Sequence, residues 1–361
     1  MAEKIYRVGV IGCGGIADGK HMPSLKKLPN VRMTAFCDIV LERAQKACEE
    51  FGAPGAKVYT DYKALVADSG LDAVHVCTPN KSHAPITIAC LEAGMHVMCE
   101  KPMAKTSKEA QDMVDAARRT GKKLSIGYQN RFRPDSLYLK KVCEAGKLGE
   151  IYYAKAHAIR RRAVPTWGVF LNEEEQGGGP LIDIGTHALD LTLWQMNNYD
   201  VQYVVGNVYR KLADTENAAN AWGPWDPAAF TVEDSAFGFI TMKNGATIVL
   251  EASWALNSLD VGEGKTTLCG AKGGADMKDG LRINGEEFSK MYELKPDLLA
   301  GGADFYEGNE QDPSDLEAES FYAAIESGGD PVVLPEQALV VTRILEAIYE
   351  SSKTGKPVYF D

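Results

Sequence analysis

The stretch YRVGVIGCGGIA, residues 6 to 17, decides the fold of the first part of the chain. A β-branched strand runs directly into GCGGIA, a GxGxxA pattern whose glycines let the backbone approach a pyrophosphate at the N-terminus of the next helix. The pattern alone is weak, but an acidic residue follows it 21 residues after Ala17, at the end of the second expected strand. The sequence therefore predicts a dinucleotide site formed by Gly12, Gly14, Gly15, Ile16 and Asp38.

Asp38 also bears on which dinucleotide is bound. A carboxylate that accepts hydrogen bonds from the ribose 2′-hydroxyl repels a 2′-phosphate. No arginine follows Asp38 until Arg43. The sequence thus favours NAD over NADP. A helix N-cap is the alternative role for Asp38, and one side chain can serve both purposes.

The first 128 residues alternate short strands with helical patterns, which predicts βαβ units and a parallel sheet. The expected strands are 6 to 12, 31 to 38, 72 to 78, 96 to 100 and 123 to 128. Helical patterns that end on glycine cover 41 to 52, 84 to 94 and 107 to 121. We therefore expect an α/β fold whose first domain, 1 to 128, is a doubly wound Rossmann domain.

Residues 129 to 361 show a different pattern. Two-residue alternation without intervening helices predicts a large open, mostly antiparallel sheet with segments at 151–161, 201–212, 231–242, 245–256 and 265–270. Helices are expected at 134–149, 181–196, 318–328 and 335–356. We expect an α+β domain for substrate binding and oligomerisation, whose C-terminal helices can pack back on the first domain. The exposed sheet face predicts a homo-oligomer.

Composition excludes several classes of partner. The 361 residues carry a formal net charge of −11, and the longest basic block is Arg160 to Arg162, so a nucleic-acid partner is not expected. No stretch is long and apolar enough for a membrane span, and the N-terminus lacks a signal-peptide pattern, so we expect a cytoplasmic protein. The eight cysteines form no CxxC pair, which predicts packing residues and no bound metal.

A group of candidate ligand-binding residues lies where neighbouring strands of the parallel sheet are expected to end, in the crevice where such sheets bind ligands. They are Thr78, Pro79, Asn80, His83 and Glu100, all predicted to bind the cofactor, and Lys101, predicted to bind cofactor and substrate. An ammonium group there would stabilise negative charge on an alcohol oxygen as its proton leaves. The alternatives are that Asn80 and His83 only cap the next helix and that Lys101 is a surface lysine.

A second motif, GGGPLIDIGTHALDL at 177 to 191, places Asp183 and His187 four residues apart, on one face of an expected helix. Histidine titrates near neutrality, as a base for an alcohol proton requires. Asp183 would bind a second hydroxyl or tune the imidazole, and Asp190 would orient it. The alternative is a histidine that only packs in the core.

These motifs occur together in one order: GxGxxA, TPN, EKP, GYQNRF at 127 to 132, and the GGGP segment. The chain thereby resembles the Gfo/Idh/MocA oxidoreductase family over its whole length. The resemblance implies that Lys101, Asp183 and His187 are catalytic and bind substrate. It also implies that Gln129 binds the cofactor and that Arg131 binds substrate.

Within the family, RRRAVPTWGVF at 160 to 170 is similar to bacterial glucoside 3-dehydrogenases, including gut-bacterial enzymes that oxidise C-glycosides such as puerarin. Trp167 would stack on a sugar or aglycone, and His157 would face the substrate if strand alternation directs it there. Core packing is the alternative for the aromatic residues.

The resemblance implies hydride transfer from a secondary ring hydroxyl, at C3, of a sugar, glycoside or cyclic polyol to NAD. The alternatives are a glycosidase that recycles NAD through transient C3 oxidation and elimination, a myo-inositol-type dehydrogenase, and a non-catalytic sugar- or NAD-sensing regulator.

Overall fold

A computed structural model describes residues 4–68, 70–298 and 312–360. The chain divides into two compact units. The first is Met1–Gln129 with Gln311–Leu339, and the second is Asn130–Glu310 with Val340–Asp361. A C-terminal segment thus belongs to the same unit as the N-terminal half of the chain.

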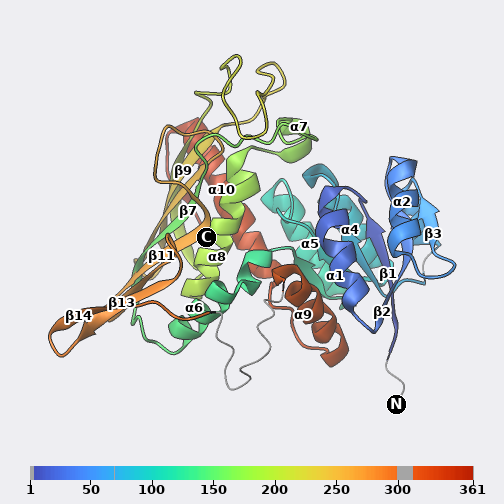
Figure 1. Cartoon of the computed structure of the whole chain (residues 1–361), viewed down its shortest axis with the longest axis horizontal. Coiled ribbons are helices and arrows are strands. Elements are labelled where there is room, and N and C mark those ends of the chain that lie inside the picture. The colour runs from blue at the N-terminus through green and yellow to red at the C-terminus, as the bar shows by residue number, and fades with distance from the viewer. Residues whose placement is uncertain (1–3, 69, 299–311, 361) are drawn as a thin grey trace. The chain divides into compact units, whose positions relative to one another are not determined.

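The first unit contains a six-stranded parallel sheet in the order β3-β2-β1-β4-β5-β6 (Figure 1). Its strands are β1 (Tyr6–Ile11), β2 (Val31–Cys37), β3 (Lys57–Tyr59), β4 (Ala73–Val76), β5 (His96–Cys99) and β6 (Leu124–Ile126). The predicted parallel Rossmann sheet is confirmed. Strand β3 was not predicted, because a three-residue strand is too short to show an alternation pattern.

Helices cover this sheet. They are α1 (Met22–Lys27), α2 (Leu41–Phe51), α3 (Tyr62–Ala67), α4 (His83–Glu92), α5 (Ser107–Thr120) and α9 (Pro313–Ser327), and the turn η1 (Ala17–His21) precedes α1. Helix α9 shares a hydrophobic core with α1 and α2, in which Tyr322 packs on Tyr6 at a centroid distance of 5.6 Å. Lys27 on α1 forms an ion pair with Asp315 on α9. The C-terminal segment therefore completes one face of the first sheet.

The second unit contains a nine-stranded sheet in the order β14-β13-β12-β11-β7-β10-β9-β8-β15. The strands are β7 (Ile151–Ile159), β8 (Val201–Tyr209), β9 (Ser235–Met242), β10 (Thr247–Ser253), β11 (Gly262–Gly270), β12 (Gly273–Asp276), β13 (Arg282–Glu287), β14 (Lys290–Leu294) and β15 (Val358–Tyr359). All neighbours are antiparallel except β7 and β10. The predicted mostly antiparallel sheet is confirmed, and β12 to β15 extend it beyond the predicted segments.

Helices of the second unit lie on one face of this sheet (Figure 1). They are α6 (Pro134–Glu144), α7 (Glu173–Gln176), α8 (Thr186–Met196) with the π-helical turn η4 (Leu181–Gly185), and α10 (Pro335–Thr354). Thr192 on α8 bonds Thr266 on β11, and an added Cβ at Gly238 on β9 would collide with Ile348 on α10. Small residues on the strands therefore let both helices lie close to the sheet.

The cysteines at strand ends are packing residues. Cys13, Cys37, Cys77 and Cys99 are buried. Burial raises the pKa of Cys13 and Cys37 to about 12, so their thiols stay neutral. Within the described ranges, no group of three or more His, Cys, Asp or Glu is placed to hold a metal ion. No helix among these residues is long and apolar enough to cross a membrane.

Candidate active site

The turn after β1 has the geometry that a dinucleotide pyrophosphate requires. Gly12 has a φ of +89°, and an added Cβ there would lie 2.5 Å from the carbonyl oxygen of Cys77. Side chains added at Gly14 or Gly15 would instead meet no atom within 4 Å. Helical structure begins at Gly15. The turn therefore leaves open space at a helix N-terminus, where a phosphate binds favourably.

Asp38 connects this turn to the end of β2. Its Oδ2 accepts a hydrogen bond from the backbone N–H of Cys13 at 2.9 Å, and its Oδ1 accepts one from Val40 N–H at 2.9 Å. The N-cap of α2 is Val40, so Asp38 is not the cap of that helix. Each carboxylate oxygen can accept more than one hydrogen bond, so the same side chain can still receive a ribose hydroxyl.

Two side chains that follow strands β4 and β6 carry buried oxygen atoms without a hydrogen-bond partner in the described part of the chain. Thr78 follows β4, and Gln129 follows β6. The atoms in question are the hydroxyl oxygen of Thr78 and the side-chain amide oxygen of Gln129. Both atoms are buried, and neither has a hydrogen-bond partner among the described residues. A buried polar atom without a partner is costly, so both atoms fit a site that a polar cofactor completes.

His83 has a structural part in this region. Its side chain is 0% exposed, and its two ring nitrogens lie 2.7 Å from Pro102 O and 2.8 Å from Thr78 O. Burial lowers the pKa of the imidazole, although both carbonyl contacts oppose this shift. His83 therefore ties the turn after β4 to the turn after β5, and the geometry favours this role over the predicted cofactor contact.

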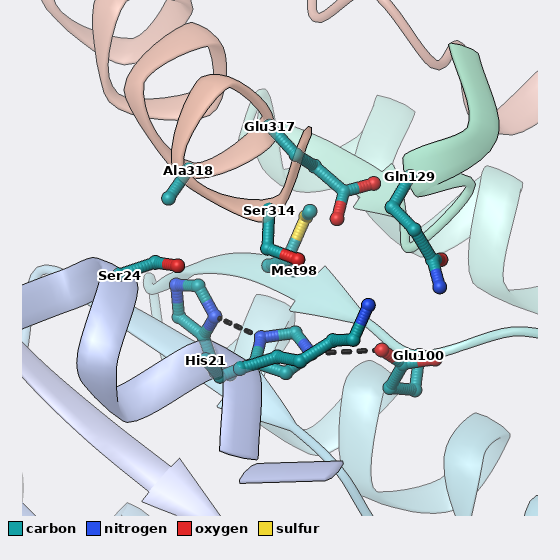
Figure 2. Close-up of a pocket in the computed structure, with 10 residues that line it drawn as sticks. His21, Ser24, Met98, Glu100, Gln129, Ser314, Glu317 and Ala318 are labelled. Atoms are coloured by element: carbon teal, nitrogen blue, oxygen red, sulfur yellow. Dashed lines mark hydrogen bonds and ion pairs between the residues drawn. The ribbon is translucent and has the colours of Figure 1, made fainter. Parts of the chain in front are cut away.

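Glu100 and Lys101 follow β5, and a chain of buried polar groups fixes Glu100. His21 Nε2 lies 2.8 Å from Glu100 Oε1, and the other His21 nitrogen lies 2.9 Å from His75 Nδ1 (Figure 2). His75 Nε2 lies in turn 3.2 Å from the hydroxyl of Tyr322. This row of polar groups runs from Tyr322 on α9 through His75 on β4 and His21 in η1 to Glu100 after β5. Its first three members could not be predicted from the sequence.

The contact with His21 at the end of this row of polar groups keeps Glu100 ionised. Burial alone would raise its pKa, but the hydrogen bond and charge of His21, with the charge of Lys101, lower it to about 2. The second carboxylate oxygen accepts a hydrogen bond from Lys101 N–H at 3.0 Å. Glu100 therefore fixes the backbone that carries the predicted catalytic lysine. Figure 2 shows Gln129 and Glu317 around the small cavity beside Glu100.

In the second unit, the GGGP segment forms the start of a continuous helix. Asp183 lies in η4 and His187 in the first turn of α8. Asp183 is half-buried, and His187 is 8% exposed. The indole N–H of Trp254 donates to Asp183 Oδ2 at 3.0 Å. Sequence reasoning missed Trp254, because a tryptophan at a strand end carries no signal of what its N–H will meet.

An aromatic cluster contacts this helix start through Trp254. Trp167 is 51% exposed and lies edge-on to Trp222 at a centroid distance of 4.8 Å and to Phe170 at 5.9 Å. Phe170 in turn contacts Trp254 at 6.4 Å, which links the cluster to Asp183. Trp167, the aromatic residue predicted to stack on a ligand, therefore lies in the same unit as Asp183, and half of its side chain is exposed.

Arg131 and Asp190 form a buried ion pair. Arg131 is 0% exposed, and its Nε and Nη2 donate to the two oxygens of Asp190 at 2.9 and 2.6 Å. Burial raises the pKa of Asp190, and the guanidinium opposes that shift. The geometry favours a structural role for Arg131, which joins the segment before α6 to α8, over the predicted substrate contact. Asp190 was predicted to orient His187. Its two oxygens bind Arg131 instead.

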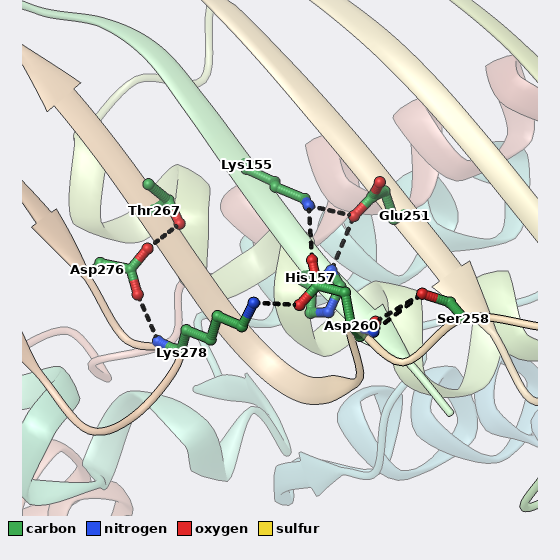
Figure 3. Close-up of polar contacts among 8 residues, drawn as sticks. All are labelled: Lys155, His157, Glu251, Ser258, Asp260, Thr267, Asp276 and Lys278. Atoms are coloured by element: carbon green, nitrogen blue, oxygen red, sulfur yellow. Dashed lines mark hydrogen bonds and ion pairs between the residues drawn. The ribbon is translucent and has the colours of Figure 1, made fainter. Parts of the chain in front are cut away.

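The geometry disfavours the predicted substrate contact of His157. On β7 the alternating residues Ala154, Ala156 and Ala158 are buried on the face that packs against α8. His157 points to the opposite face, where its Nδ1 lies 2.8 Å from Glu251, an acid that also pairs with Lys155 (Figure 3). The alternation of a strand therefore separates His157 from Asp183 and His187 by the thickness of the sheet.

A glycine turn after a first parallel strand and an acidic residue after the second are the features of a dinucleotide-binding Rossmann fold. Residues 6–128 match the family described as "Oxidoreductase family, NAD-binding Rossmann fold", and residues 140–360 match its "C-terminal alpha/beta domain". The chain belongs to the Gfo/Idh/MocA oxidoreductase family. The family that its motifs predicted is therefore confirmed, and the protein is an enzyme of the oxidoreductase class.

Two curated relatives have named activities. The chain is 37% identical to D-glucoside 3-dehydrogenase of Escherichia coli K12 over 361 residues, which cover 99% of this chain and 98% of the relative. It is 32% identical to inositol 2-dehydrogenase/D-chiro-inositol 3-dehydrogenase of Lactiplantibacillus plantarum over 70% of this chain and 66% of that one.

Solved structures share the fold. An oxidoreductase domain protein from Kribbella flavida aligns with a TM-score of 0.85 at 24% identity over 99% of this chain and 100% of that one. Levoglucosan dehydrogenase in complex with NADH and levoglucosan aligns with a TM-score of 0.82 at 22% identity over 99% of each chain.

Proposed function

We propose that this protein is an NAD-dependent dehydrogenase that oxidises a secondary ring hydroxyl of a sugar, a glycoside or a cyclic polyol to the ketone. The favoured position is C3 of a pyranoside. The supporting observation is the helix start of the second unit, where Asp183, held by Trp254, and His187 lie beside an exposed aromatic cluster. The 37% identity to a D-glucoside 3-dehydrogenase supports the choice of substrate and position.

Each polar residue has one task in the proposal. His187 removes the proton of the reacting hydroxyl, a contribution typically worth about 10²- to 10⁴-fold in rate. Lys101 stabilises the negative charge that develops on the same oxygen. Asp183 accepts a hydrogen bond from a neighbouring hydroxyl and thereby orients the ring. Trp167 stacks on the sugar or on its aglycone.

NAD is the proposed cofactor, and the nicotinamide ring accepts the hydride that leaves the carbon atom. Gly12, Gly14 and Gly15 would hold the pyrophosphate, with Ile16 beside them at the helix start. Asp38 would bind the adenosine ribose, which favours NAD over NADP. Thr78 and Gln129 would donate or accept hydrogen bonds toward the nicotinamide half, together with Pro79, Asn80, Glu100 and Lys101 around the strand ends.

The decisive experiment is a panel of glycosides and polyols, C-glycosides included, incubated with the purified full chain and NAD. Absorbance reports reduced cofactor, and mass spectrometry reports a product that has lost two hydrogens with its substituent still attached. Lys101→Ala and His187→Ala are expected to bind NAD like the wild-type protein and to lose turnover by at least about 100-fold. Near-wild-type turnover in either variant contradicts the assigned roles.

The same panel separates the alternatives. Release of the C1 substituent without net NADH would show a glycosidase that returns the hydride to its product. Oxidation of inositols in place of pyranosides would show a cyclic polyol dehydrogenase. An absence of turnover on the whole panel, with NAD binding intact, would favour a sensing protein.

A second copy of this chain is the proposed partner of the open sheet face. Helices α8 and α10 cover one face of the nine-stranded sheet, and the other carries aromatic residues, among them Tyr209 and Phe239, which are 40% and 46% exposed. Both lie in register positions that share a face with His157 and its polar partners. Apolar area of this kind is usually buried by association.

A further inference from the structure

One buried acid stands at the start of the helix that carries Asp183 and His187. Glu233 is 7% exposed and precedes β9. Its Oε2 accepts a hydrogen bond from Gly179 N–H at 2.9 Å, and its Oε1 accepts one from Leu181 N–H at 3.1 Å. The hydroxyl of Tyr349 on α10 donates to Oε1 at 2.9 Å. One carboxylate therefore joins the GGGP turn, the sheet and α10.

The glycines of the GGGP segment allow this approach. An added Cβ at Gly179 would collide with the backbone carbonyl of Glu233, and one at Gly178 would collide with the Tyr349 hydroxyl. Further along the helix, an added Cβ at Gly185 would lie 2.9 Å from the Cβ of Ala252. The small residues therefore allow both the carboxylate and the sheet to hold the helix start.

The first turn of a helix leaves backbone N–H groups without partners inside the helix, and its dipole favours a negative charge there. Glu233 supplies acceptor oxygens to two of these N–H groups at the start of η4. Asp183 follows Leu181 by two residues, so the hydrogen bond to Leu181 N–H fixes the same turn that carries Asp183. His187 follows one helical turn later.

We propose that Glu233, held by Tyr349, is a positioning residue that sets the placement of Asp183 and His187 for the reaction. This inference rests on the proposed function. The carboxylate touches neither reacting atom nor cofactor in the proposal, and it acts through the backbone of Gly179 and Leu181.

The electrostatics of the site supports this role. Burial raises the pKa of Glu233 to about 7, and the hydrogen bonds from Gly179, Tyr349 and Leu181 limit the rise. Burial also raises the pKa of the Tyr349 hydroxyl well above its ordinary value, so Tyr349 stays a donor. A buried acid costs free energy, and its partners are the backbone and side chain that fix the helix start.

The test compares Glu233→Gln with Asp234→Asn. The amide that replaces the carboxylate in Glu233→Gln retains one acceptor oxygen, so one of the two backbone N–H groups loses its partner. Asp234 is the matched control: its buried carboxylate accepts hydrogen bonds from Leu212 and Ala213 N–H, away from the catalytic helix. Tyr349→Phe is a second variant, which removes one hydrogen bond and keeps the ring.

The first readout is kinetic. Glu233→Gln is expected to lower kcat by about ten-fold or more, since small misplacements of reacting groups are costly, with the KM for NAD unchanged. Tyr349→Phe is expected to lower kcat by about two- to ten-fold, the range of one neutral hydrogen bond. Asp234→Asn should keep the wild-type kcat when it is assayed at a temperature well below the Tm of this variant. Wild-type kcat in both Glu233→Gln and Tyr349→Phe overturns the proposal.

The second readout does not depend on activity. The indole N–H of Trp254 contacts Asp183, and its NMR signal, assigned among five tryptophans through Trp254→Phe, reports the position of that acid. The signal should move in Glu233→Gln and Tyr349→Phe and stay in Asp234→Asn. An unmoved signal in both test variants overturns the positioning role. If the wild-type protein oxidises no sugar, the proposed function fails, and the indole signal still decides whether Glu233 sets the place of Asp183.

Discussion

Trp254 donates its indole N–H to Asp183 Oδ2 at 3.0 Å, although 71 residues separate the two in sequence. Trp254 is 0% exposed, so its ring is part of the core and its N–H faces the acid. The contact fixes one oxygen of the Asp183 carboxylate at the start of the helix.

Trp254→Phe removes this donor and keeps an aromatic ring. Hydrogen bonds to charged groups are typically worth about 1.5 to 3 kcal/mol, so kcat/KM for the sugar should fall by about ten-fold or more, while NAD binding stays the same. Trp225→Phe is the matched control, because its indole N–H donates to Ala213 O at 2.8 Å. Equal losses in both variants would mean that packing alone explains the effect.

The contact between His21 and Glu100 predicts a change in acid stability. The pKa of Glu100 falls from 4.5 to about 2, a shift worth about 3 kcal/mol. Because the folded-state pKa is lowered, this stabilisation is present above pH 4.5 and is lost as the pH falls toward 2. His21→Leu should remove the part of this stabilisation that His21 supplies, while Lys101 keeps its own part, and should lower the free energy of unfolding, measured in urea near pH 6.

A double-mutant cycle checks the cause. In a Glu100→Gln background, His21→Leu should no longer change the dependence of unfolding free energy on pH. A shift of the same size with and without Glu100 would assign the effect to packing of the His21 ring.

The carboxylate of Asp38 is expected to set the preference for NAD over NADP. Asp38→Ser removes the negative charge, so affinity for NAD should fall and affinity for NADP should rise. The ratio of the two dissociation constants should change by at least about ten-fold, which corresponds to about 1.4 kcal/mol. Asp68→Ser, which changes an exposed acid paired with Lys57, should leave the ratio unchanged. An unchanged ratio in Asp38→Ser would remove this residue from the ribose site.

The exposed side chain of Phe239 on the open sheet face allows the proposed association to be tested. Phe239→Glu places a charge on the open sheet face, so an assembly through that face should dissociate toward monomers in sedimentation velocity. Phe288→Glu is a suitable control, because Phe288 is 91% exposed at the turn between β13 and β14. A wild-type protein that sediments as a monomer would contradict the proposed association.

Much of the fold could be predicted because its signals are local. The glycine turn, the strand that precedes it and the helix from 181 to 196 each depend on residues within one turn or one strand, and the structure contains all of them. The strand β3 and the hairpin of β13 and β14 were missed, because short or exposed strands show no clear alternation.

The sequence did not predict to which face of the sheet a strand residue points. A shift of one residue along β7 changes the face to which a side chain points, and the pattern 151 to 161 does not say which face a helix will cover. Packing decides which face is covered. Helix α8 packs against the face of β7 that carries the alanines, so His157 lies on the other face.

The sequence by itself determined the class of protein, because the glycine turn, the acid 21 residues later and the order of motifs are properties of short segments. Only the tertiary structure decided the partners of the charged and polar groups. Arg131 meets Asp190 across 59 residues, His21 meets Glu100 across 79, and Tyr322 meets His75 across 247. Such pairs form because a buried polar group must find a partner, and packing decides which partner is within reach.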